Sequence, residues 1–359
     1  MKKWIAFALM LFSIIVLSGC NRGPVLYLLN WGEYINEDLV ASFEEEYGVR
    51  VEIEKVDSNE AMYSKIKAKT TQFDVAVPSD YMIHKLYKED LLVELDFDQL
   101  PNYSETMFDP LLDTLRDEYF DGNKDVSVPY FWGTLGIMVN TNKTGLETLV
   151  EENGWRVFFD AELTGDAKIG MYNSSRDAVA VAQMHLGYDI NSTEESVFTE
   201  VENLLKAQNY FAWGTDDLKE MVANGNCDIA LVYSGDFFDM LYASMEDELP
   251  ITYNMVVPDL NNIWFDAMVI PTTSTNQTLA HQFINFMIDA ENAYTNATEV
   301  GYCPPITAAY EAILADPDFE EVVTNYPYYP GLVTEGIIYE DLGTEIYRQL
   351  EILLINAKS

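Results

Sequence analysis

Acidic and aromatic side chains recur where the predicted strands end and loops begin. These short segments cover residues 30–34, 78–81, 176–177, 233–235, 264–266 and 301–302. Carboxylates pair strongly with ammonium groups. Aromatic faces attract cations and cover methylene groups. Together, these side chains predict a site for a flexible organic cation that carries more than one ammonium group.

Taken singly, each of these side chains has an ordinary structural explanation. Trp31 and Trp264 are also typical of a packed core, and Tyr302 of a loop beside proline. Ser79 suits a helix N-cap. Asp80 and Asp177 suit the negative charge that helix N-termini favour. The recurrence of such residues at strand ends is what favours a binding site.

The elements that would position them alternate between strands and amphipathic helices. Strands are expected at residues 25–29, 49–56 and 73–77, and helices at 37–47, at 61–69 and from Ser79 onward. Asn36 is expected to cap the first helix and Gly48 to end it. This order predicts an α/β fold with a mostly parallel sheet flanked by helices.

A second α/β series follows, with strands expected at residues 168–172, 228–233 and 252–257. Two long extended runs, 127–140 and 264–271, interrupt the alternation, and we interpret them as hinge strands that cross between two lobes. Lobe one would contain residues 25–133 and 266–311, and lobe two residues 134–265 and 312–359, including a helix near 341–356. Ligands collect at the carboxyl ends of strands in open α/β sheets, so two facing sheets predict a cleft that closes.

The N-terminus predicts export and a lipid tether. Lys2 and Lys3 precede an apolar run at residues 4–17, which has the length of a secretory signal rather than of a membrane span. The run ends in Leu-Ser-Gly before Cys20, which resembles the cleavage and lipidation motif of bacterial lipoproteins. We therefore expect a signal peptide at 1–19, lipid on Cys20 and a linker at 20–24, in an extracytoplasmic protein anchored to the membrane. An ordinary signal peptide with an incidental cysteine is the alternative.

Composition narrows the function classes. The chain has 60 acidic and 20 basic side chains and a formal net charge of −40, which repels nucleic acid and attracts cations. Its three histidines are far apart and no metal-ligand spacing occurs, so we expect neither a metal nor a cofactor. Cys227 and Cys303 could form one disulfide.

Several blocks resemble the family of spermidine/putrescine-binding proteins of polyamine ABC transporters. They are Leu29-Asn30-Trp31 with Glu33-Tyr34, Ser58-Asn59-Glu60-Ala61-Met62-Tyr63, Phe73-Asp74-Val75-Ala76-Val77-Pro78-Ser79, Val128-Pro129-Tyr130 with Trp132-Gly133, Trp264 with Asp266, and Gly301-Tyr302. The order and spacing of these blocks resemble those of the family. Together the blocks extend over nearly the whole chain from Val25 onward. The resemblance implies a two-lobe periplasmic-binding-protein fold of type II, a polyamine ligand and an ABC transporter permease as partner.

The resemblance also implies the ligand-binding residues. They are Trp31, Glu33, Tyr34, Ser79 and Tyr81 in the first lobe, Asp177 and Tyr233 in the second, and Trp264, Asp266, Tyr302 and Tyr339 at the remaining positions. Asp177 and Asp266 would pair with ammonium groups.

Four positions depart from the family pattern. Gly32 replaces a frequent hydroxyl residue, Ser174 a possible second acid, Tyr233 a tryptophan and Tyr339 a glutamine. These departures leave the choice between spermidine and putrescine open.

Two other functions stay open. Another solute, such as a sugar, a cationic amino-acid-like compound or ferric iron, could occupy such a cleft, although a sugar would not need the acids. A secreted hydrolase is the second alternative, but the sequence contains no G-x-S-x-G motif, since Ser234 lacks the first glycine of that motif. We therefore expect a binding protein rather than an enzyme.

Overall fold

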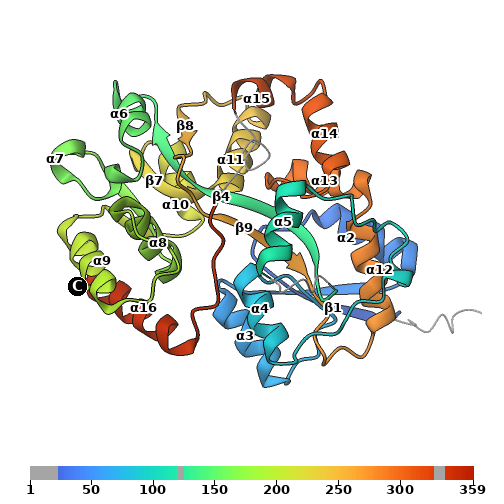
Figure 1. Ribbon diagram of the computed structural model, residues 1–359. Coiled ribbons are helices and arrows are strands. Elements are labelled where there is room, and N and C mark those ends of the chain that lie inside the picture. The colour runs from blue at the N-terminus through green and yellow to red at the C-terminus, as the bar shows by residue number, and fades with distance from the viewer. Residues whose placement is uncertain (1–22, 120–124, 327–335) are drawn as a thin grey trace, which may run out of the picture.

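The computed structural model describes residues 23–119, 125–326 and 336–359 (Figure 1). The predicted signal peptide and Cys20 lie outside the described residues. None of the helices in the described ranges combines the length and the apolar character needed to cross a bilayer.

The first sheet is parallel and has three strands. β1 (Val25–Asn30) lies between β2 (Arg50–Lys55) and β3 (Val75–Ala76). The connecting helices are α2 (Glu37–Tyr47) and α3 (Asn59–Ala68), and α4 (Asp80–Lys88) follows β3. The Asn36 side chain caps α2, and Gly48 ends it with φ of 65°, a left-handed conformation that glycine adopts without strain. The predicted βαβαβα order is confirmed.

The second sheet has six strands and is mixed. β6 (Ala212–Gly214), β5 (Ile169–Tyr172) and β7 (Ile229–Tyr233) are parallel neighbours, and β4 (Val128–Asn140) runs antiparallel to β7, β8 (Tyr253–Val256) and β9 (Ile263–Met268). The helices on this side of the molecule are α6 (Leu146–Asn153), α7 (Ala161–Thr164), α8 (Ser175–Leu186), α9 (Glu195–Ala207), α10 (Asp217–Ala223) and α11 (Ser234–Glu246). Both long extended runs are therefore strands, as predicted.

Strands β4 and β9 join the two lobes. The first half of β4 pairs with β9, and its second half pairs with β7 and β8. Just beyond β9, Val269 exchanges two backbone hydrogen bonds with Ala76 of the first sheet. Figure 1 shows both strands passing through the middle of the molecule. All thirteen residues of β4 are buried. This arrangement confirms two lobes joined by crossing strands.

The chain then returns to the first lobe and ends on the second. Helices α12 (Gln277–Met287), α13 (Ala290–Val300), α14 (Thr307–Ala315) and α15 (Glu320–Asn325) follow β9, and α5 (Pro110–Tyr119) precedes β4. The last helix, α16 (Thr344–Ala357), packs against α8 and α9 (Figure 1). A helix near this position was predicted. The predicted residue boundaries of the lobes stay a prediction.

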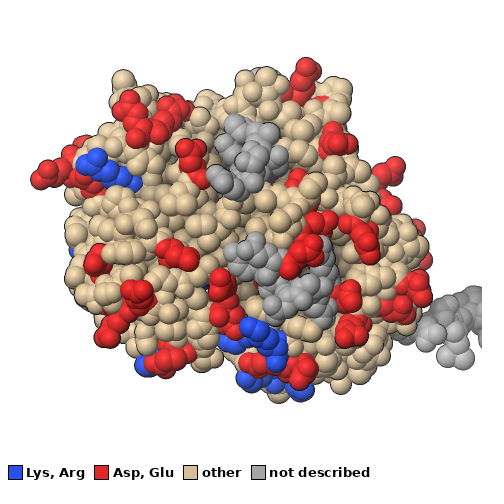
Figure 2. Space-filling view, viewed as in Figure 1, with Lys and Arg blue, Asp and Glu red and all other residues tan. Residues whose placement is uncertain are grey.

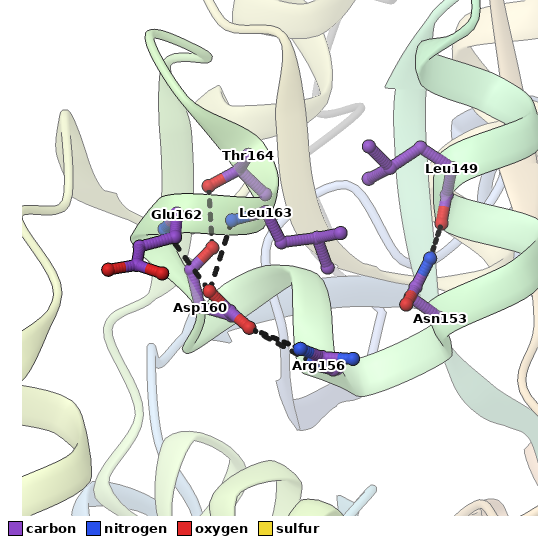
Figure 3. Close-up of polar contacts among 7 residues, drawn as sticks. All are labelled: Leu149, Asn153, Arg156, Asp160, Glu162, Leu163 and Thr164. Atoms are coloured by element: carbon purple, nitrogen blue, oxygen red, sulfur yellow. Dashed lines mark hydrogen bonds and ion pairs between the residues drawn. The ribbon is translucent and has the colours of Figure 1, made fainter.

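Local polar contacts fix the outer corner of the second lobe (Figure 3). The Asp160 carboxylate accepts hydrogen bonds from the amides of Glu162 and Leu163 at the start of α7. The same carboxylate pairs with Arg156, four residues earlier. Such a cap replaces the helical partners that the first amides lack.

Three details differ from the sequence-based expectation. β3 has only two residues, because its parallel register with β1 covers Val75 and Ala76 alone and Pro78 follows without an amide hydrogen. The short strand β6 was not predicted. Cys227 and Cys303 are buried thiols and form no disulfide with each other.

Candidate ligand-binding site

A cavity of about 310 Å3 lies where the strands of both lobes end. All eleven predicted site residues line it: Trp31, Glu33, Tyr34, Ser79, Tyr81, Asp177, Tyr233, Trp264, Asp266, Tyr302 and Tyr339. They come from the ends of β1, β3, β5 and β7, from β9, and from the segments after α13 and before α16. The structure therefore brings the predicted set together, while its role in binding stays a prediction.

Asp177 is held by two tyrosines at one end of the cavity. Its carboxylate oxygens accept hydrogen bonds from the hydroxyls of Tyr233 and Tyr339, each at 2.8 Å. The Arg176 guanidinium lies 4.0 Å from the centre of the Tyr339 ring. Ser174 caps α8 by accepting a hydrogen bond from the Asp177 amide. Asp177 thus lies in the first turn of a helix and also lines the cavity.

Asp266 is a buried carboxylate in the cavity wall. It is 5% exposed, and its Oδ1 atom makes no hydrogen bond to any described residue. Burial raises the pKa of Asp266 to about 7, although the hydroxyls of Ser79 and Tyr34 lower that pKa in part. A buried carboxylate oxygen without a partner is costly unless a ligand supplies one.

Trp264 lies on the same strand as Asp266, two residues earlier. Side chains two apart on a strand share a face, and both residues line the cavity. The indole Nε1 of Trp264 also lacks a partner among the described residues. This face of β9 therefore offers a ring and a carboxylate together.

Aromatic rings form a row across the cavity. Trp264 packs edge-to-face between Tyr233 and Tyr302, with ring centroids 5.5 and 5.6 Å apart. Tyr34 adds a further edge contact to Tyr302 at 5.0 Å. Trp31 also lines the cavity, and its indole N–H donates to the carbonyl of Val77 at 2.8 Å. Such rings can cover the methylenes of an alkyl chain and face its cations.

Ser79 and Tyr81 line the first-lobe wall at the start of α4. Ser79 occupies the N-cap position, but its hydroxyl makes no capping bond and accepts instead from the Asn59 side chain. Tyr81 donates to Glu60. Between them, Asp80 turns away from the cavity and accepts from the Phe265 amide. Burial raises the pKa of Asp80 to about 8.

At the far end of the cavity, the sequence reasoning missed four charged residues, Asp216, Lys219, Asp236 and Asp239. The Lys219 ammonium lies 2.6 Å from Asp239, 3.7 Å from Asp236 and 3.8 Å from Glu33. Asp236 also accepts from the Tyr302 hydroxyl at 3.0 Å. Burial raises the pKa of Asp236 to about 6, against the effect of Lys219. Asp216, near Tyr172, completes the acidic lining there.

Comparison with known proteins assigns the family. Residues 38–327 match the model of the bacterial extracellular solute-binding proteins. The chain belongs to this family. This membership agrees with the two lobes, the crossing strands and the cavity, and it places the protein among extracytoplasmic binding proteins rather than in an enzyme family.

Individual solute-binding proteins are similar over most of their length. The spermidine/putrescine-binding periplasmic protein of Escherichia coli is 28% identical over 336 residues, covering 91% of each chain. The putrescine-binding periplasmic protein SpuD of Pseudomonas aeruginosa is 29% identical, covering 89% of this chain and 90% of its own. The solved structure of the spermidine/putrescine ABC transporter substrate-binding protein PotD from Streptococcus pneumoniae is 34% identical, with a TM-score of 0.73, covering 94% of this chain and 99% of its own.

Proposed function

We propose that this solute-binding protein captures a polyamine, spermidine or putrescine or both, in the cavity between its lobes and delivers it to an ABC transporter permease. The observation that carries the proposal is the buried Oδ1 of Asp266, which has no hydrogen-bond partner among the described residues and belongs to the same strand face as Trp264. A ligand ammonium group would donate a hydrogen bond to Asp266 Oδ1. The Trp264 ring would cover the methylene groups next to that ammonium.

The rest of the cavity supports a cationic, partly apolar ligand. Its wall contains acidic side chains at both ends and aromatic rings between them. Acidic side chains are also spread over the visible face of the molecule (Figure 2), in keeping with the formal net charge of −40. Such a field attracts small cations toward the cleft. The names of the relatives from E. coli, P. aeruginosa and S. pneumoniae refer to spermidine or putrescine.

Ligand capture depends on both lobes. Trp31, Glu33, Tyr34, Ser79 and Tyr81 are proposed to contact the ligand from the first lobe, and Asp177, Tyr233 and Tyr339 from the second. Trp264, Asp266 and Tyr302 complete the site. A ligand that contacts both walls favours the closed arrangement over an open one, because those contacts exist together only when the lobes approach. The closed form is what the permease would receive.

We also propose that the protein is tethered to the membrane by lipid on Cys20. The apolar run at residues 4–17 and the Leu-Ser-Gly-Cys motif support this. A tether holds the binding protein near its permease and raises the effective concentration of one for the other.

A ligand panel tests the function. Thermal unfolding is followed with putrescine, cadaverine, spermidine, a neutral disaccharide, arginine and γ-aminobutyrate, each at saturating concentration. A ligand at about 100 times its Kd stabilises by about 2.7 kcal/mol, which corresponds to a rise in Tm of several degrees. We expect this rise with the polyamines only. We also expect the ligand recovered after incubation with the protein to be chemically unchanged. A rise with the sugar or an amino acid, and none with any polyamine, contradicts the proposal.

A further inference from the structure

A buried lysine closes one end of the cavity. Lys219 lies on α10, is 6% exposed, and points its ammonium at Asp239 and Asp236 of α11. Burial opposes the charge of Lys219, but Asp236 and Asp239 outweigh it and raise the pKa of the ammonium above its usual range. Lys219 is therefore a charged alkylammonium group fixed inside a cavity whose charged lining is mostly acidic, with Arg176 as a second cation.

Three carboxylates are spaced along the aromatic row. At one end, Asp177 accepts from the Tyr233 hydroxyl. At the other end, Asp236 accepts from the Tyr302 hydroxyl. The middle ring of the row is Trp264, and Asp266 follows it by two residues on the same strand. The row therefore presents three acidic positions to an extended chain.

These three positions are not equally available. Within the part of the chain that the structure describes, one oxygen of Asp266 has no hydrogen-bond partner. The Asp177 oxygens accept hydrogen bonds from the neutral hydroxyls of Tyr233 and Tyr339, which an ammonium group can displace or share. Asp236, in contrast, already faces the Lys219 ammonium at 3.7 Å. Of these three, Asp266 and Asp177 therefore remain available to the charges of a ligand.

We propose that Lys219 acts as a resident third ammonium, so that the site selects diamines such as putrescine over the triamine spermidine. This inference rests on the proposed function. A lysine side chain ends in the same primary alkylammonium group as a polyamine. Lys219 therefore pairs with Asp236 and Asp239 in the way that the terminal ammonium of a longer ligand would. The third charge of spermidine would meet a like charge in a desolvated space, where repulsion is strong.

Lys219 also lies near a carboxylate of the first lobe. Glu33 belongs to the first lobe, its side chain is 78% exposed, and it lies 3.8 Å from the ammonium. Without Lys219, Glu33, Asp236 and Asp239 would all be available to a ligand charge. Replacing Lys219 with a neutral residue should therefore allow these carboxylates to bind an ammonium group of the ligand.

The test is calorimetric titration of the full mature chain with putrescine and with spermidine. The wild-type protein is expected to bind putrescine at least tenfold more tightly than spermidine. Lys219→Met should move the ratio of the two Kd values at least tenfold toward spermidine. Lys219→Arg, which keeps the charge, and Lys206→Met, which removes a surface lysine paired with Glu202, should leave the ratio within threefold of wild type.

The double variant Lys219→Met/Asp239→Asn repeats the test without leaving Asp239 unpaired, in case the single variant does not fold. Removing both partners of a buried pair is far less damaging than removing one. A wild-type preference for spermidine, or an unchanged ratio in a folded variant without Lys219, overturns this inference and leaves the polyamine function standing. A wild-type protein that binds no polyamine overturns the function itself.

Discussion

Gly133 lies directly against the indole ring of Trp264, its partner across the β4–β9 pair. A Cβ atom at Gly133 would fall 2.3 Å from Cζ2 of that ring and 3.0 Å from the Ser234 hydroxyl. The position of the ring in the cavity thus depends on the absence of a side chain on the neighbouring strand.

Gly133→Ala should therefore displace Trp264 and weaken polyamine binding at least tenfold. Overpacking of this kind costs about 1–3 kcal/mol. Gly136→Ala is the matched control on the same strand, since its Cβ would meet the flexible tip of Met255, which does not line the cavity. Calorimetry and thermal unfolding of both variants separate the effects. If both lose stability and neither loses affinity, the ring does not contribute to binding.

Asp266→Asn should weaken polyamine binding by on the order of a hundred- to a few-thousand-fold. Removing one partner of a buried ion pair costs about 3–5 kcal/mol, at about 1.4 kcal/mol per tenfold. The substitution keeps the shape and removes the charge. Asp80→Asn is the control, because burial raises the pKa of Asp80 to about 8 and that carboxyl is mostly neutral at pH 7. Near-wild-type Kd values in folded Asp266→Asn would refute the role of this carboxylate.

Polyamine affinity should rise with pH between 5 and 7. Burial raises the pKa of Asp266 to about 7, and a bound ammonium favours the ionised form and lowers that pKa. Affinity should then increase by up to about tenfold per pH unit below pH 7 and level off above it, with proton release on binding. Titrations in buffers of different ionisation enthalpy measure the released protons. In Asp266→Asn the slope should be lost, and a slope that persists there would assign it to another group.

The stability of the ligand-free protein should change in the opposite direction. The folded pKa values of Asp266 and Asp80, about 7 and about 8, exceed their usual value near 3.9. Each group therefore contributes its full stability below about pH 4 and loses it as pH rises through its folded pKa. We expect the Tm of the ligand-free protein to fall between pH 5 and pH 8, and this fall to be smaller in Asp80→Asn. A Tm that rises over this range in both proteins would contradict the burial of these acids.

Trp264→Leu should weaken binding by about 1–2 kcal/mol, because it keeps apolar bulk and removes the π face. Of the six tryptophans, Trp31 and Trp264 line the cavity, so polyamine should change the fluorescence of the wild-type protein. Trp31→Phe serves as the comparison, since it removes the other indole and keeps a ring. A full fluorescence response and unchanged affinity in folded Trp264→Leu would return this residue to a packing role.

Cys20→Ser should release the protein from membranes without altering its affinity for polyamine. Metabolic labelling with a fatty-acid analogue and fractionation of cells test this directly. Labelled, membrane-bound Cys20→Ser protein would indicate a different tether.

Local signals account for what the sequence predicted well. Asn36 and Gly48 delimit α2 as expected, because helix caps depend on neighbouring residues alone. The long runs around Trp132 and Trp264 were correctly interpreted as crossing strands, because extended apolar runs of that length are typical of buried strands. The strand-end rule predicted most of the segments that line the cavity, and the family resemblance added Tyr339.

What the sequence could not supply is proximity between elements far apart in the chain. Lys219 occurs in Asp-Asp-Leu-Lys-Glu, a pattern typical of an exposed helix face. Only the packing of α10 beside α11 buries its ammonium against Asp236 and Asp239. Nor could the sequence show that the two tyrosines at 233 and 339 share the Asp177 carboxylate.

The shared strand β4 also dictates an order of assembly. The first half of β4 can pair only after β9 has been synthesised. The backbone hydrogen bonds between Ala76 of the first sheet and Val269 can likewise form only then. A chain emerging from its N-terminus must therefore keep an unpaired strand edge until most of its length has appeared. Non-local pairing of this kind slows folding, and an open edge invites association with other chains. A polypeptide that must cross a membrane before it folds benefits from this delay, because the β4–β9 pairing that joins the lobes cannot form before β9 has emerged.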